Sequence, residues 1–320
     1  MSMLREQITQ LSNEANAILA PAVVRTPLLP YRDGVYLKAE NLQRTGSFKF
    51  RGAYYSIATL SPTQRQAGAI AYSTGNHAQA VALAGTLLGV NTTVVMSETA
   101  PSEKIANTKR FGASVIMAEN SSFARKQLAE QLAAEHGYGL IPPYEDLKVM
   151  AAQGTIALEI LAALDTAQTI VVPIGGGGLI AGIATVAKAL KPSIRVIGVE
   201  PAGAADAHQS YVSHQLTRWD SITTICDGLS VQQLGSTNFD LIQEVVDDIV
   251  VVDDALTQRA MRTLLLDHRL LVEASGAITV AALDNGLITG AEPAVAVLSG
   301  GNIAPAKIIA MLSDSAAINA

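Results

Sequence analysis

The stretch TIVVPIGGGGLIAGIATVAKAL, residues 169–190, places a strand, a glycine loop and a helix in direct succession. Residues 169–175 are an aliphatic run of the kind found in strands buried on both faces of a parallel sheet. The glycines at 175–178 leave their N–H groups unobstructed at a helix N-terminus, where the helix dipole favours an anion such as phosphate. The alternative is a tight turn that lets the helix pack closely on the sheet. Either way, this unit predicts a parallel α/β fold.

The same alternation of aliphatic runs and helical segments continues along the chain. Eight runs are predicted as strands: 35–40, 69–73, 92–97, 114–119, 169–175, 195–200, 248–253 and 294–300. Strands that alternate with crossover helices form parallel sheets covered on both faces, and the Pro142–Pro143 pair interrupts regular structure between two such series. We therefore expect two open, twisted, mainly parallel sheets flanked by helices. The predicted domains are a small one, 68–145, and a large one, 1–67 plus 146–320.

The composition excludes several classes of protein. The 320 residues are 49% hydrophobic, which supports a substantial core, and the net charge of −6 without a basic run argues against nucleic acid and acidic membranes as partners. Cys226 is the only cysteine, so neither an intrachain disulfide nor a cysteine zinc cluster is possible. The N-terminus lacks the apolar segment of a signal peptide, and no apolar run reaches the roughly 18 residues of a membrane span. A soluble cytoplasmic protein is expected.

Lys49 lies between Phe48 and Phe50 in TGSFKFRGA, residues 45–53. By itself it would be interpreted as a surface lysine whose stem lies along apolar neighbours. Apolar surroundings lower the pKa of an amine, however, and the free amine is the form that attacks carbonyls. Combined with the glycine loop, Lys49 indicates a phosphorylated aldehyde held as a Schiff base.

Six segments occur in an order that resembles the fold-type II pyridoxal-phosphate enzymes, whose fold is like that of tryptophan synthase β. They are LKAENLQRTGSFKFRGA, STGNHAQA, AAQGTIALEI, PIGGGGLIAGIA, GVEP and LSGGN. The resemblance extends from Thr26 to Asn302 and is closest to the serine/threonine dehydratase and serine racemase branch.

This resemblance implies a cofactor site drawn from four segments. Lys49 corresponds to the Schiff-base lysine and Phe48 to the residue that packs on the pyridine ring. Asn76 corresponds to the partner of the ring hydroxyl, and Ser299 to the partner of the pyridine nitrogen. The phosphate cradle corresponds to Gly175, Gly176, Gly177 and Gly178. A neutral hydroxyl at Ser299 makes the ring a weaker electron sink than a carboxylate would, which suits β-elimination or racemisation better than transamination.

The resemblance also implies a substrate site on the loop at residues 73–77. The residues that match the family's carboxylate-binding segment are Ser73, Thr74, Gly75, Asn76 and His77, with His77 shaping the loop rather than acting in catalysis. Dehydratases often have a small apolar residue at the position of Thr74, whereas racemases have a serine that protonates the opposite face. Thr74 is therefore either a second catalytic acid/base or a residue that shapes the pocket. Arg125 either binds the second carboxylate of 3-hydroxyaspartate or is a solvated charge on a helix.

A divalent cation is the third implied ligand. Racemase-like relatives place Mg²⁺, Mn²⁺ or Ca²⁺ at the spacing of Glu200, Ala204 and Asp206, with two carboxylates and the backbone carbonyl of the middle residue. Oxygen donors of this type suit all three ions. The alternative is that the two acids cap the start of a helix.

The expected function is pyridoxal-phosphate-dependent dehydration and deamination of serine, threonine or 3-hydroxyaspartate to a 2-oxo acid and ammonia, with Lys49 taking the α-proton. The alternatives are a serine- or aspartate-type racemase with side dehydratase activity, or a catalytically inactive ligand-binding relative. An amino acid is the expected small-molecule partner, and a homodimer the expected assembly because family members commonly form one. No regulatory domain is expected after the segment SGGN at 299–302.

Overall fold

The computed structural model describes residues 2–290 and 292–313. Strands among these residues form two sheets, in the orders β1-β2-β10-β7-β8-β9 and β5-β4-β3-β6. The larger sheet contains β1 (Leu28–Arg32), β2 (Val35–Lys38), β7 (Thr169–Pro173), β8 (Arg195–Pro201), β9 (Asp248–Val252) and β10 (Ala294–Val297). The smaller contains β3 (Ala69–Tyr72), β4 (Thr92–Ser97), β5 (Ser114–Ala118) and β6 (Gly139–Leu140). All strand pairs are parallel except β1 with β2, so the expected fold class is confirmed.

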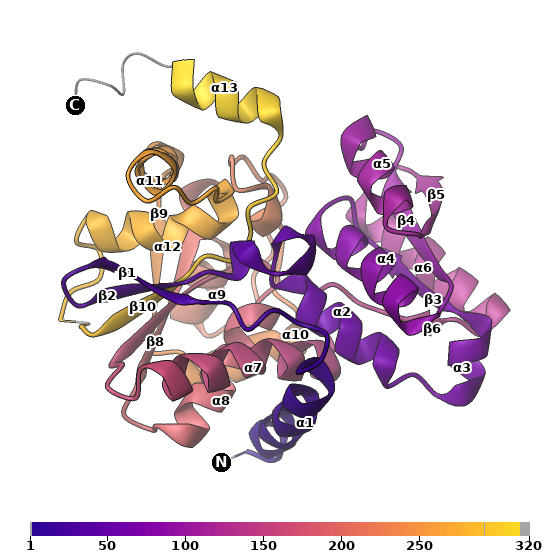
Figure 1. Cartoon of the computed structure of the whole chain (residues 1–320), viewed down its shortest axis with the longest axis horizontal. Helices are drawn as coiled ribbons and strands as arrows, with labels where there is room; N and C mark the ends of the chain where they lie inside the picture. The colour runs from indigo at the N-terminus through magenta and orange to yellow at the C-terminus, as the bar shows by residue number, and fades with distance from the viewer. Residues whose placement is uncertain (1, 291, 314–320) are drawn as a thin grey trace.

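Helices cover both faces of the larger sheet (Figure 1). The helices α7 (Leu147–Ala163), α8 (Gly178–Leu190) and α10 (Ser236–Val245) bury aliphatic side chains against one face. On the other face lie α11 (Asp254–Leu266) and α12 (Ala274–Asp284). The remaining elements of this part are α1 (Met3–Leu19), α9 (Asp206–Ser213), α13 (Pro305–Ser313) and the short 3-10 turns η1 (Glu40–Leu42), η2 (Arg44–Gly46), η3 (Ala202–Ala204) and η4 (Asp227–Leu229).

The smaller sheet is covered in the same way. The helices α2 (Lys49–Ala58) and α4 (Asn76–Leu88) pack on one face, and α6 (Ser122–His136) packs on the other. The helices α3 (Pro62–Ala67) and α5 (Ser102–Arg110) complete this part. In the part of the chain that the structure describes, none of the helices combines the length and apolar character needed to cross a membrane.

All eight predicted strands are present, with small shifts at their ends. Two further strands, β1 and β6, were not predicted. Pro30 interrupts β1, which is tolerated because β1 is an edge strand, and β6 has only two residues. The strands of the smaller sheet lie between Ala69 and Leu140, inside the range expected for the small domain, whose boundaries stay a prediction.

The helix α2 joins the two parts, because it packs both on α4 beside the smaller sheet and on α7 beside the larger one. Lys49 is the first residue of α2. The lysine is therefore held where the two sheets approach each other, at the carboxyl ends of their strands, where open α/β sheets bind ligands.

Candidate active site

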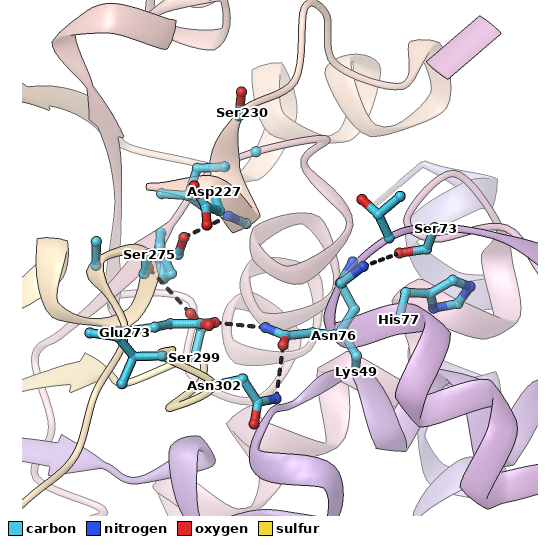
Figure 2. Close-up of a pocket in the computed structure, with 18 of the residues that line it drawn as sticks. Lys49, Ser73, Asn76, His77, Asp227, Ser230, Glu273, Ser275, Ser299 and Asn302 are labelled. Carbon is cyan, nitrogen blue, oxygen red and sulfur yellow. Dashed lines mark hydrogen bonds between the residues drawn. The ribbon is translucent and has the colours of Figure 1, made fainter. Parts of the chain in front are cut away.

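A cavity of about 950 Å³ lies at this junction and is lined by residues from both parts of the chain (Figure 2). Three predicted loops meet in it, each at the carboxyl end of a strand: 73–77 after β3, 175–178 after β7, and the segment that begins at Ser299 after β10. Phe48 and Lys49 also line the cavity. Segments far apart in the sequence are thus brought together as expected.

Lys49 is half-buried, and its amine faces the cavity. Its Nζ donates a hydrogen bond to the carbonyl of Pro143 at 2.6 Å and lies 5.0 Å from the centre of the Phe48 ring. Burial lowers the pKa of Lys49 to about 8, because no carboxylate compensates the loss of water around the ammonium form. A useful fraction of the amine is therefore uncharged and nucleophilic near neutral pH.

The four glycines of the loop 175–178 are constrained to different degrees. A Cβ on Gly176 would lie 2.3 Å from the Tyr144 ring, and one on Gly178 would lie 2.5 Å from the Tyr144 carbonyl oxygen. A Cβ on Gly175 would lie 3.1 Å from the Leu229 backbone, and Gly177 has a φ of +88°, which disfavours any side chain. Close packing therefore explains Gly176 and Gly178, the positive φ explains Gly177, and a side chain at Gly175 would need only a small shift of its neighbours.

The argument for an anion site rests on the amides of the same loop. Within the described part of the chain, the N–H groups of residues 175–180 find no acceptor on the protein. Residues 175–179 line the cavity at the N-terminus of α8, a helix of 13 residues whose dipole adds to the field of these amides. Asn238, fully buried on α10, donates to the carbonyl of Gly176 at 2.6 Å and holds the loop in place. The loop is thus built to receive an anion such as a phosphate.

The loop 73–77 leads from β3 into α4 and also faces the cavity. The hydroxyl of Ser73 accepts from the N–H of Gly75 at 3.2 Å, and Thr74 lines the cavity. His77 is buried, and its Nε2 lies 2.9 Å from the carbonyl oxygen of Ile141. Burial, and secondarily the charge of Lys49, lower the pKa of His77 to about 3, so the ring is neutral. This contact supports a loop-shaping role for His77.

Asn76, at the start of α4, and Ser299, after β10, both line the cavity (Figure 2). The Nδ2 of Asn76 donates to Glu273 Oε1 at 2.7 Å, and its Oδ1 accepts from Asn302 Nδ2 at 2.8 Å. The Ser299 hydroxyl is almost fully buried and donates to the carbonyl of Ser275 at 3.2 Å. A hydroxyl rotates about its C–O bond, so Ser299 can turn to a ligand in the cavity.

Several residues of the site were missed from the sequence. Glu273 precedes the apolar helix α12, where an acid is ordinarily interpreted as a capping residue. Tyr144 follows the Pro142–Pro143 pair, and Asn238 lies within a helix with no motif around it. Only Asn302 carried a signal, because it closes the segment SGGN.

The structure does not bring Arg125 to the cavity. Arg125 lies on α6, outside the residues that line the cavity, and its Nη2 donates to Ser122 of the same helix at 3.0 Å. Apart from Lys49, the lysines on the cavity wall are Lys104 on α5 and Lys307 on α13.

The predicted metal ligands lie away from the cavity, at the end of β8 and the start of α9. Glu200, Ala204 and Asp206 are all buried. The Glu200 carboxylate accepts from the N–H groups of Ala207 and His208 at 2.9 and 2.8 Å, so it caps α9. Burial, and secondarily Asp206, raise the pKa of Glu200, while burial raises that of Asp206 to about 7.

One oxygen of this pair is unaccounted for. In the described residues Asp206 Oδ2 is buried without a hydrogen-bond partner, and no group of three His, Cys, Asp or Glu side chains gathers there or elsewhere. A cation at this site would therefore rely on backbone carbonyls or water for its other ligands.

This fold, with a half-buried lysine facing unpaired amides at a helix N-terminus, defines a cofactor-dependent enzyme. The family model of pyridoxal-phosphate dependent enzymes matches residues 19–300, and the chain belongs to this family. The groups present fit the cofactor: an amine of lowered pKa for its aldehyde, unsatisfied amides for its phosphate and a buried hydroxyl for its ring.

Comparison with individual proteins gives the same family. The chain is 41% identical over 302 residues to the catabolic L-threonine dehydratase TdcB of Staphylococcus aureus, covering 91% of this chain and 87% of that protein. The structure of maize serine racemase superposes with a TM-score of 0.90 at 36% identity, covering 95% of this chain and 96% of that one. The processed form of threonine deaminase isoform 2 from Solanum lycopersicum gives a TM-score of 0.90 at 32% identity, covering 97% of this chain and 89% of that one.

Proposed function

We propose that this chain is a pyridoxal-phosphate-dependent ammonia-lyase that converts serine or threonine to a 2-oxo acid and ammonia. The observation that carries the proposal is the amine of Lys49, whose pKa is lowered by burial and which faces the same cavity as the unpaired amides of residues 175–179. The 41% identity to an L-threonine dehydratase supports this substrate class.

Different residues of the cavity have different roles in such a reaction. When bound, the cofactor withdraws electrons from the α-carbon of an attached amino acid. The Lys49 amine would be the base that accepts the α-proton. The N–H groups that begin α4 bind the substrate carboxylate at a helix N-terminus. Ser299 offers a hydroxyl where a carboxylate would favour transamination, so loss of the β-hydroxyl is the favoured outcome.

The substrate 3-hydroxyaspartate stays a secondary candidate. The residue expected to bind its second carboxylate, Arg125, lies outside the cavity lining. Lys104 and Lys307 are the lysines that could replace it, and both are already close to Asp227. We therefore place this substrate behind serine and threonine.

Racemisation is the second candidate activity, and Thr74 is the observation that favours it. Its hydroxyl lies on the cavity wall beside Ser73, on the loop that begins α4. Reprotonation from a second face requires such a donor opposite Lys49. Formation of D-serine from L-serine, lost in Thr74→Ala while 2-oxo acid release persists, would establish this activity.

We also propose a divalent cation at Glu200, Asp206 and the carbonyl of Ala204. The support is the buried Asp206 oxygen without a partner beside a second buried carboxylate. A bound cation would stabilise the ionised form of both carboxylates, which burial otherwise disfavours.

The proposed function is tested by measuring 2-oxo acid and ammonia release from serine, threonine and the 3-hydroxyaspartate diastereomers. Serine or threonine is expected to be the best substrate, and Lys49→Ala is expected to lose both turnover and the violet-edge absorbance that borohydride removes from the native protein. Turnover retained in Lys49→Ala would exclude this mechanism. Absence of turnover on all substrates by the cofactor-loaded native chain would favour an inactive ligand-binding relative.

A further inference from the structure

Glu273 has a defined place in the cavity that the reaction described above does not use. It immediately precedes α12, and its backbone N–H donates to the carbonyl of Gly300 at 3.0 Å. Its carboxylate lines the cavity and accepts from Asn76 Nδ2 at 2.7 Å, across the junction between the two parts of the chain (Figure 2). A carboxylate in this position therefore contacts the Asn76 amide directly and can determine its orientation.

The orientation of the Asn76 amide follows from a chain of hydrogen bonds. The carbonyl of Thr45 only accepts, so the group of Asn302 that lies 2.7 Å from it is the amino group. The same amino group lies 2.8 Å from Asn76, and the atom of Asn76 that accepts from it must be Oδ1. The amino group of Asn76 therefore faces Glu273. Its second N–H is left to donate into the cavity.

The reverse orientation is excluded at both ends of the amide. It would place the Asn76 carbonyl against the Glu273 carboxylate and the Asn76 amino group against the Asn302 amino group. Two acceptors would then face each other on one side and two donors on the other. One orientation of Asn76 is selected as long as Glu273 is an acceptor.

The backbone beside Ser299 makes room for this contact. A Cβ on Gly300 would lie 2.4 Å from Glu273 Oε1 and 3.2 Å from Asn76 Nδ2. Glycine at this position therefore allows the carboxylate and the amide to meet. The segment after β10 thus provides the Ser299 hydroxyl and the space for Glu273.

The charges around Glu273 come from three other elements. Burial raises the pKa of Glu273 to about 7, the hydrogen bond from Asn76 and the charge of Lys104 on α5 oppose this, and Asp227 in η4 adds to it. Lys307 on α13 is paired with Asp227 at 2.9 Å. At pH 8 the carboxyl is predominantly ionised and only accepts, so it reinforces the orientation that Asn302 sets, whereas a protonated carboxyl could also donate and would leave Asn302 alone to set that orientation.

We infer that Glu273 is a positioning residue which, with Asn302, fixes the Asn76 amide so that an N–H, and not the carbonyl, faces the ring hydroxyl of the cofactor. The inference rests on the proposed function, because it requires pyridoxal phosphate in this cavity. It gives Glu273 a role through Asn76 rather than through contact with the substrate.

The test is a double-mutant cycle on cofactor affinity. Apo-protein is titrated with pyridoxal phosphate at pH 8, and the visible absorbance gives Kd for the native chain, Glu273→Gln, Asn76→Ala and the double variant. Glutamine is isosteric but presents both a donor and an acceptor. Glu273→Gln is expected to weaken binding about 10-fold in the native background, equivalent to about 1.4 kcal/mol, and less than about 2-fold in the Asn76→Ala background.

Two further variants keep the outcome unambiguous. Glu103→Gln removes another carboxylate from the cavity wall, on α5, and is expected to change Kd less than about 2-fold. Asn302→Ala removes the hydrogen bond to Asn76 Oδ1. It is expected to weaken cofactor binding as Glu273→Gln does, again only when Asn76 is present. Thermal unfolding of the apo-proteins checks that each variant is folded.

The opposite results are equally clear. A loss of affinity of the same size with and without Asn76, an equal loss in Glu103→Gln, or no loss in Glu273→Gln would each overturn the role of Glu273 while leaving the proposed function intact. A native chain that binds no pyridoxal phosphate would instead overturn the proposed function, and the inference with it.

Discussion

Replacing Arg51 by methionine should destabilise the protein strongly, because Arg51 is fully buried behind Lys49 in a network of charges. Its Nε and Nη2 donate to the two oxygens of Glu40 at 2.9 and 2.7 Å, and its Nη1 donates to Glu159 at 2.7 Å. Lys38 pairs with the second oxygen of Glu159 at 2.5 Å. Two buried cations and two buried anions therefore compensate each other.

The size of the effect follows from what the substitution leaves behind. Without Arg51, two buried carboxylates share the single charge of Lys38, and breaking a buried ion pair on one side costs about 3–5 kcal/mol. Unfolding entropies of about 2.1 cal/mol/K per residue give about 0.7 kcal/mol/K for 320 residues. A loss of about 4 kcal/mol therefore lowers the melting temperature by about 6 °C.

The assay is thermal unfolding followed by circular dichroism at pH 7, with both proteins in the same cofactor-loaded state. The control is Arg32→Met, which breaks exposed pairs with Asp284 and Glu292 and should cost less than about 1 kcal/mol. If the melting temperature of Arg51→Met lies within about 1 °C of the native value, as expected for the Arg32→Met control, the reasoning is refuted.

The pH dependence of the same variant has a definite sign. Despite burial, pairing with Arg51 holds the pKa of Glu40 below its ordinary value of 4.5. The stabilisation from this pair is therefore complete above pH 4.5 and is lost as the pH falls through the folded-state pKa. The difference in stability between the native chain and Arg51→Met should be largest near neutral pH and shrink in acid. A difference that grows in acid would contradict this explanation.

Three further predictions concern the amine, the cation and the core. The rate at which apo-protein attaches pyridoxal phosphate should rise about tenfold per pH unit below the Lys49 pKa of about 8 and level off above it, as followed by stopped-flow absorbance. If the ion is present at about 100 times its Kd, its removal by EDTA should lower the melting temperature by about 4 °C. Addition of Mg²⁺, Mn²⁺ or Ca²⁺ should restore the melting temperature, and EDTA should have no effect on the Glu200→Gln/Asp206→Asn double variant. Gly182→Ala places a Cβ 2.1 Å from the carbonyl oxygen of Met150, where α8 packs on α7. It should therefore lower the free energy of unfolding, measured in urea, by about 1–3 kcal/mol. An unchanged urea midpoint would contradict the close packing of these two helices.

Most of the fold could be predicted because parallel strands buried on both faces consist of continuous aliphatic runs. Most of the eight predicted strands have this composition, although β5 is only partly buried. The strands that escaped prediction lack it: β1 contains Pro30 and pairs at the sheet edge, and β6 spans only Gly139–Leu140. Their positions are set by neighbouring strands rather than by their own residues.

The candidate site was predictable where chemistry and local sequence coincide. Lys49 and the loops after β3, β7 and β10 stand at strand ends, which sequence pattern locates well. Glu273 contacts Asn76, which is 197 positions away in the chain, and the residues next to Glu273 in the sequence do not indicate this contact. The direction in which Arg125 points depends on the packing of α6, which sequence position alone does not give.

The glycine run 175–178 has a consequence for how this family changes over time. An aromatic ring excludes a side chain at position 176, backbone atoms exclude one at position 178, and left-handed geometry disfavours one at position 177. Selection for folding alone would preserve these three glycines, even in a descendant that no longer carried out any reaction. A sequence survey that uses the glycines as its mark of an active enzyme would count such inactive descendants, whereas the presence of Lys49 would tell the two apart.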